Sequence, residues 1–176
     1  MIKMKKLKKI IFLSLLSSLG LALSIIESIM PIPFIAPGAK LGLSNMVVLI
    51  TLVVFGLKES LIVGILKSLV FTLVTGSVTS LVYSISGSIF SCFTMFIILK
   101  YYSNVFSLIG VSIFGAIAHN TAQILVASLI MSNFKMFTYL PILLLTSLFT
   151  GYFVGLASKF ISKNLKVIYP RLNETN

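Results

Sequence analysis

The chain has 176 residues, of which 58% are hydrophobic and 10% are charged, and its mean hydropathy is +1.14. A soluble globular domain of this size could not bury so much apolar surface, so the composition indicates an integral membrane protein. The net charge is +11, but no basic groove with interleaved aromatic residues accompanies the lysines, which argues against a nucleic-acid partner. Contact with anionic lipid headgroups explains the charge better.

Six apolar stretches predict an all-α polytopic bundle of six transmembrane helices. In chain order they are Ile10–Met30, Leu41–Leu57, Ser60–Val74, Thr79–Leu99, Val105–Ile130 and Thr138–Ile161. None alternates polar and apolar residues, as the strands of a membrane β-barrel do. A crossing helix needs roughly 20 apolar residues, so the short second and third stretches should be tilted, buried by neighbours or extended into their connections. The whole chain, 1–176, is then one domain: a basic N-terminus (1–9), the bundle (10–161) and a tail (162–176).

Basic residues predict the orientation of this bundle. Eleven of them fall on one side of the membrane: Lys3, Lys5, Lys6, Lys8, Lys9, Lys58, Lys100, Lys159, Lys163, Lys166 and Arg171. Lys40 and Lys135 fall on the other side, and Lys67 lies inside a predicted helix. The positive-inside rule therefore places both termini of this multi-pass protein in the cytoplasm.

The first stretch has a second interpretation. Lys3–Lys9, the apolar run and Ala22-Leu23-Ser24 are typical of a signal peptide with its cleavage site. The apolar run continues to Met30, however, which favours a retained helix.

Residue types for catalysis and metal binding are scarce. There is no aspartate, the acids are Glu27, Glu59 and Glu174, and His119 and Cys92 are single in their types. A magnesium-diphosphate enzyme needs clustered carboxylates, and a zinc site needs several ligands. The serines have no evident base to activate them, and no Walker sequence is present. The sequence thus predicts no catalytic site, no metal and no cofactor.

Lys67 is the first candidate for binding. It follows Lys58 by nine residues, roughly 13 Å along a helix, which places it near the middle of the bilayer. A charge there costs at least about 2.5–3.5 kcal/mol, so Lys67 should face the interior, paired or available to an anion. The alternatives are pairing with a carbonyl or with Glu27, or snorkelling along a tilted helix.

A polar trio in the fifth stretch is the second candidate. His119 and Gln123 are four residues apart, and Asn120 and Gln123 are three apart, so the three are expected to share a helix face. They could bind a solute, or they could join helices by hydrogen bonds.

The segment Pro31–Lys40 is the third candidate. Its prolines rule out a continuous helix and predict a stiff loop outside the membrane. Lys40, beside the start of the next helix with Asn45, makes an anion-binding corner plausible. An ordinary capped connection is the alternative.

Small residues recur at four-residue spacing in two helices. Ser14, Ser18 and Ala22 form one stripe, and Ser147, Gly151 and Gly155 form the other. Such stripes allow close helix packing. A further set of small polar residues, Ser84, Gly87, Ser88 and Ser91, is expected to be structural.

Several of these segments together resemble the Gx transporter family, which is also known as heptaprenyl diphosphate synthase component I. The resemblance lies in Glu27, Pro31-Ile32-Pro33 and the run from Pro37 to Asn45, PGAKLGLSN. Gly56–Glu59, Ser84–Ser88 and His119–Gln123 extend it, so that it covers roughly residues 10–160.

The resemblance implies a six-helix substrate-capture component similar to those of energy-coupling factor transporters. Such components work with a separate membrane coupler and two ATPases, and their first helix often carries small residues four apart for docking the coupler. Ser14, Ser18 and Ala22 match that spacing, with serine in place of the more usual alanine. Lys67 stands where arginine is more usual, which keeps the charge but loses the bidentate fork.

These features indicate two possible functions, and a purely structural role is the alternative to both. The first is uptake of a small anionic or amphipathic solute, bound by Lys67, His119, Asn120 and Gln123, with Asn45, Lys40 and Glu27 beside them. The second is a non-catalytic accessory role in heptaprenyl diphosphate or menaquinone side-chain synthesis, because the aspartate-rich motifs of prenyl synthases are missing. The third is a scaffold whose polar residues only fasten helices together.

Overall fold

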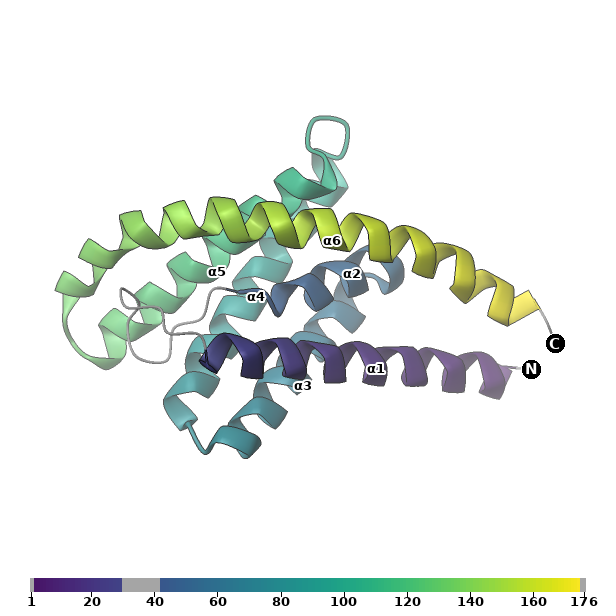
Figure 1. The fold of residues 1–176 in the computed structure, drawn as a ribbon, viewed down its shortest axis with the longest axis horizontal. Helices are drawn as coiled ribbons and strands as arrows, with labels where there is room; N and C mark the ends of the chain where they lie inside the picture. Colours follow the sequence, from purple (N-terminus) through teal and green to yellow (C-terminus); the bar gives the residue numbers. More distant parts are fainter. Residues whose placement is uncertain (1, 30–41, 175–176) are drawn as a thin grey trace.

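The computed structural model describes residues 2–29 and 42–174, with side chains from Leu7 to Val167 within those ranges, and its regular structure is helical (Figure 1). The elements are α1 (Ile2–Ile29), α2 (Asn45–Phe55), α3 (Leu57–Thr75), α4 (Val78–Tyr101), α5 (Leu108–Ile130), the 3-10 turn η1 (Phe134–Tyr139) and α6 (Leu140–Glu174). The described ranges contain no strand, and the all-α prediction is confirmed.

Four helical segments are long and apolar enough to cross a membrane: Leu7–Ile29, Val78–Tyr101, Leu108–Ile130 and Phe134–Val167. The distribution of side chains agrees with a lipid environment. Large apolar residues such as Leu73, Phe149 and Phe153 are exposed, while Lys67 and many serines are buried. In water this arrangement would be unfavourable, because polar groups would leave solvent and apolar groups would face it. The chain is therefore a membrane protein, while six crossings and the orientation of the termini stay predictions.

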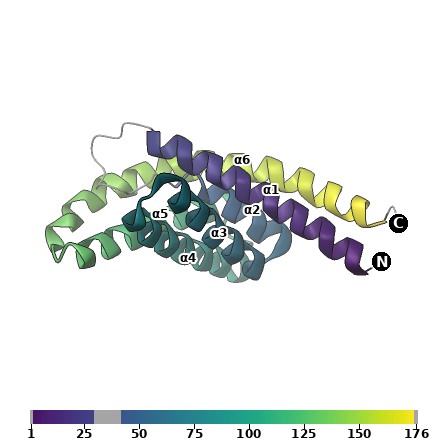
Figure 2. The same cartoon turned by 90° about the horizontal axis from the view of Figure 1, so that it is seen from below.

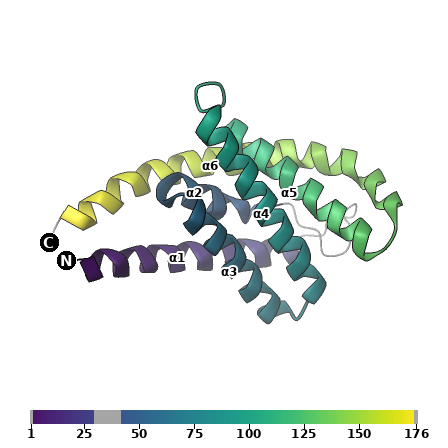
Figure 3. The same cartoon turned by 180° about the vertical axis from the view of Figure 1, so that it is seen from behind.

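The short helix α2 occupies the centre of the bundle. It lies between α1 and α6 in Figure 1, and Figure 3 shows α3 and α4 on its other side. Its 11 residues rise only about 16 Å, half of the hydrocarbon thickness. Its residues from Val47 to Leu52 are all buried, so of the three expected outcomes for the short second stretch, burial by neighbours is the one observed.

A single glycine connects α2 to α3. Gly56 has φ +98°, a conformation that favours glycine, and its N–H donates to the carbonyls of Thr51 and Leu52 at the end of α2. The next residue already begins α3. The two helices thus form one tight hairpin.

The first and last helices are longer than the sequence predicted. α1 begins at Ile2 instead of Ile10, and α6 continues to Glu174, past the expected end at Ile161. Lysine is a good helix former, so a basic segment need not end a helix that apolar packing has started. The two helices run in opposite directions, and the ends of the chain lie at one end of the molecule (Figures 1 and 2).

The α5–α6 interface depends on the glycine stripe of α6. A Cβ atom at Gly151 would lie 2.6 Å from the Cα atom of Ile113, and one at Gly155 would lie 2.6 Å from the Cα atom of Ile109. The two backbones therefore approach as closely as glycine permits. This stripe is internal packing, one of the outcomes that its spacing allowed.

Candidate functional site

Two buried charges from different helices reach the residues that begin α2. Lys67 of α3 is only 1% exposed, and its Nζ donates to Oγ of Ser44 at 2.8 Å and to Oδ1 of Asn45 at 3.5 Å. Glu27 of α1 is also buried, and its Oε1 accepts a hydrogen bond from the N–H of Leu43. One cation and one anion thus approach three consecutive residues, 43–45.

The prediction that Lys67 faces the interior is confirmed, and the snorkelling alternative fails. The side chain passes close to α1, where a Cβ atom at Gly20 would lie 3.3 Å from Cδ of Lys67. Hydrogen bonds to a hydroxyl and an amide oxygen explain how the chain tolerates an ammonium group among apolar helices. Ser44 stands at the N-cap position of α2 but makes no side-chain capping bond. Its hydroxyl oxygen accepts from the ammonium instead.

His119 lies beside the same residues. Gly42, where φ is +88°, lies between the side chains of Asn45 and His119. A Cβ atom at Gly42 would be 3.0 Å from Nδ2 of Asn45 and 3.6 Å from Cδ2 of His119. On its other side the imidazole covers Gly87 of α4, where a Cβ atom would lie 2.6 Å from Cε1 and Nδ1. His119 therefore occupies the space that the missing side chain of Gly87 leaves.

Asn120 faces a different helix from His119. Its Nδ2 donates to Oγ of Ser147 at 2.8 Å and to the carbonyl of Leu143 at 3.3 Å, both on α6. These are the contacts that the helix-fastening alternative predicts for this residue. Gln123 is buried on α5 as well.

Two polar atoms of the candidate residues are buried without a hydrogen bond to the described part of the chain. They are Nδ2 of Asn45 and Oδ1 of Asn120. A buried amide group without a partner costs about 1–3 kcal/mol. These atoms are therefore positions where a polar ligand group or an ordered water would be stabilising.

The remaining candidates are not gathered at this place. Lys40 and the rest of the predicted loop Pro31–Lys40 lie outside the described residues. Ser14, Ser18 and Ala22 are exposed along the outer side of α1. Beside this stripe, α1 and α3 enclose an apolar groove of about 430 Å3, lined by Ile10, Leu13, Ser14, Ser17, Ile62, Leu66 and Val70.

The small polar residues of α4 pack against neighbouring helices. Ser84 shares a hydrogen bond of 2.7 Å with Ser68 of α3. A Cβ atom at Gly64 would lie 3.4 Å from Cβ of Ser88, and one at Gly115 would lie 3.2 Å from Oγ of Ser91. These contacts agree with the structural role predicted for the small polar residues of α4.

Sequence reasoning missed the residues that shape the site. Ser44, Gly20 and Gly42 contact or border Lys67, Asn45 and His119, yet none was singled out for that role. A serine just before an apolar run is a known helix-start signal, which could have drawn attention to Ser44. Its use as an acceptor for a lysine 23 residues away has no local signal.

The chain matches a known protein family over most of its length. The family model for heptaprenyl diphosphate synthase component I matches residues 16–161. The chain belongs to this family. No curated protein and no solved structure matches the chain.

The polar groups at the start of α2 are suited to binding a small polar molecule. The described ranges of this component I protein hold no group of three His, Cys, Asp or Glu side chains that could share a metal ion. The groups that meet at Leu43–Asn45 and His119 are an ammonium, a carboxylate, an imidazole and an amide. Such a set can hold a small polar molecule by charge and hydrogen bonds.

Proposed function

We propose that this protein is the solute-capture subunit of a transporter in the bacterial plasma membrane, energised by a separate membrane coupler and ATPases. The solute is small and either anionic or amphipathic. It binds at the start of α2, in contact with Lys67, Asn45 and His119, and Gln123 and Lys40 complete the proposed site.

The burial of Lys67 is the observation that carries this proposal. An ammonium held at the depth of the bilayer costs stability, and a membrane protein retains such a group most often because it serves a solute or ion. Lys67 donates hydrogen bonds to oxygens of Ser44 and Asn45, which hold its head group at the start of α2, where the solute is proposed to bind. The buried Nδ2 of Asn45, which lacks a hydrogen bond to the described chain, adds a donor beside that charge.

The groove between α1 and α3 is the proposed docking surface for the coupler. Its rim includes the exposed small residue Ser14, and Ser18 and Ala22 continue the stripe along α1. Small residues allow a partner helix to approach closely in a membrane. Asn120 has a supporting role in this proposal, because its amide joins α5 to α6.

A co-purification experiment tests the capture function. The protein is purified in mild detergent, and the small molecules released on denaturation are identified by mass spectrometry. We expect one polar solute at near-equal molar amount, lost in Lys67→Met and retained in Lys67→Arg. Lys58→Met is the matched control, since it removes an exposed lysine from the same helix. Retention of the solute by Lys67→Met would refute the site.

A second candidate function comes from the family description. An accessory subunit of heptaprenyl diphosphate synthesis would bind a soluble prenyl synthase, and the family description, which names a component of such a synthase, supports this candidate. Affinity purification from native membranes separates the two. A coupler and ATPases are expected for the capture subunit, and a prenyl synthase for the accessory subunit.

A further inference from the structure

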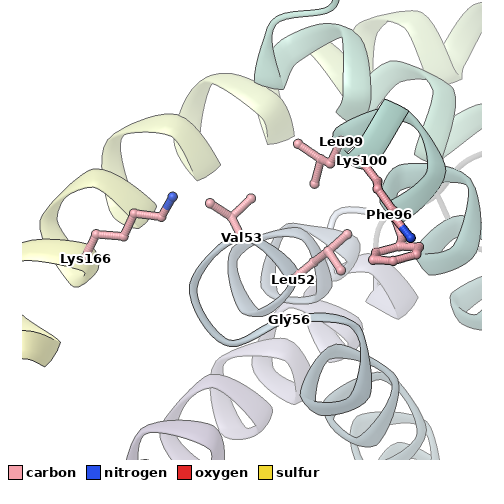
Figure 4. A pocket seen from close by; sticks show the side chains of 7 residues that line it. All are labelled: Leu52, Val53, Gly56, Phe96, Leu99, Lys100 and Lys166. Carbon is pink, nitrogen blue, oxygen red and sulfur yellow. The ribbon is translucent and has the colours of Figure 1, made fainter. Parts of the chain in front are cut away.

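A second hollow lies at the opposite end of α2 from Lys67 (Figure 4). Its volume is about 300 Å3, and its lining comes from the end of α2, from α4 and from α6. The lining residues are Leu52, Val53, Gly56, Phe96, Leu99, Lys100 and Lys166. None of them belongs to the candidate solute site, so this hollow is independent of the proposed function.

The hollow combines apolar walls with two cations. Figure 4 shows Lys166 extending from α6 toward Val53, and Lys100 reaching from α4 beside the ring of Phe96. Nζ of Lys100 lies 5.7 Å from the centroid of Phe96 and 5.2 Å from that of Tyr101, within the range of cation–π attraction. These rings hold one ammonium at the rim of an apolar surface.

No acidic side chain between Leu7 and Val167 that the structure describes forms an ion pair with Lys100 or Lys166. Of the described side chains, only Glu27 and Glu59 are acidic, and Glu27 is at the other end of α2. Oε2 of Glu59 would lie 3.8 Å from a Cβ atom at Gly56, but the charge of this carboxylate is already matched by Lys9, which is 2.5 Å from its Oε1. The local charge of the hollow is therefore positive.

We infer that this hollow binds the phosphate group of an anionic phospholipid, with the first carbons of its acyl chains against the apolar walls. A free inorganic anion would leave Leu52, Val53 and Leu99 without a contact, and a neutral apolar molecule would leave both ammonium groups unused. A volume of about 300 Å3 is at the small end of ligand pockets, which suits a headgroup and a short part of a chain. The site lies in a membrane protein whose Lys159 and Lys163 add positive charge along the same helix as Lys166.

Binding of short-chain lipids to the purified protein tests the inference. Native mass spectrometry or a titration in detergent compares three probes: dioctanoyl phosphatidylglycerol, dioctanoyl phosphatidylcholine and inorganic phosphate. We expect the phosphatidylglycerol to bind most tightly, because it alone offers both net negative charge and acyl chains. Inorganic phosphate or the zwitterionic lipid binding as tightly as phosphatidylglycerol would overturn the inference.

Paired substitutions locate the binding. The double variant Lys100→Gln with Lys166→Gln should weaken phosphatidylglycerol binding about thirtyfold, from the usual contribution of two lysines near an anionic headgroup. The matched control, Lys159→Gln with Lys163→Gln, removes the same charge from residues that do not line the hollow and should change affinity much less. Equal weakening by both pairs would show diffuse surface attraction and overturn the site.

A third variant tests the apolar wall with the lysines intact. Val53→Phe adds bulk inside the hollow, and its expected effect is at least a tenfold loss of phosphatidylglycerol binding with unchanged salt dependence. Unaltered lipid affinity in Val53→Phe would contradict the placement of the acyl chain. A melting curve in detergent is recorded for each variant. If Val53→Phe unfolds, the comparison of the two double lysine variants decides whether the hollow binds the lipid, because all four lysines are exposed and their replacement should not unfold the protein.

Discussion

Replacing Gly87 by alanine should displace His119 and thereby weaken solute capture. The added Cβ atom would lie 2.6 Å from both Cε1 and Nδ1 of the imidazole and 3.0 Å from Nε2. Carbon atoms in contact normally stand about 3.5–4.0 Å apart, so the ring must retreat by roughly 1 Å. His119 is buried and faces Gly42 on its far side, so little free space receives the ring.

The expected magnitude follows from two opposing terms. Overpacking of this kind costs about 1–3 kcal/mol, whereas replacing glycine by alanine inside a helix returns up to about 1 kcal/mol. The net loss of stability is then at most about 3 kcal/mol, which lowers the melting temperature of a chain of this size by up to roughly 6–12 °C. A displaced imidazole that loses one hydrogen bond to the solute weakens binding by about tenfold.

Gly64→Ala provides the matched control for this experiment. Gly64 is a buried glycine on the neighbouring helix α3, where a Cβ atom would meet Ser88 at 3.4 Å, close to ordinary contact. Melting in detergent and binding of the co-purified solute are measured for both variants. If Gly87→Ala matches Gly64→Ala in both measurements, the ring is not held where the structure places it, or the solute does not contact it.

Three further predictions concern the stability of the bundle. Gly151→Ala should lower the melting temperature in detergent more than Gly64→Ala does, because its Cβ atom would meet backbone; equal melting would contradict the close α5–α6 packing. Asn120→Ala should cost about 0.6–1.7 kcal/mol of stability by removing its bonds to α6, and a loss of solute without a change in melting would instead indicate direct binding. The hydrogen bond from Lys9 lowers the pKa of Glu59 below its usual 4.5, so this pair stabilises the fold above about pH 4.5 and the contribution disappears as the pH falls further. Being partly exposed, the pair contributes less than about 1 kcal/mol; Glu59→Gln should remove that part of the pH dependence, and an identical melting profile from pH 7 to 3 would refute it.

The helical fold could be predicted from the sequence because apolar run length is a local property. The centres of all six predicted stretches are helical, and the ends differ where local signals compete. The fifth helix starts at Leu108 rather than Val105, since Ser107 takes the N-cap position and accepts from the N–H of Gly110. The ends at Met30 and Leu41 fall outside the described residues.

The site was only partly predictable, because its contacts join distant parts of the chain. The depth of Lys67 along its helix was enough to indicate an inward position. The separation of His119 from Asn120 was not foreseen, although neighbouring residues on a helix point about 100° apart. One faces Gly87 on α4, and the other bonds to α6. The spacing of residues does not determine which helices pack on either side of α5, because that depends on the tertiary fold.

The length of α2 also bears on how the protein enters its membrane. A segment of 11 residues cannot be threaded through a bilayer as an independent unit, because its first backbone groups would stop halfway across, in hydrocarbon. Gly56 joins it to α3 with no intervening linker, so the pair must partition during biogenesis as one folded-back unit. In the folded chain, Glu27 of α1 and Lys67 of α3 both reach the start of α2, so this end of the helix depends on two neighbours that flank it in space but not in sequence.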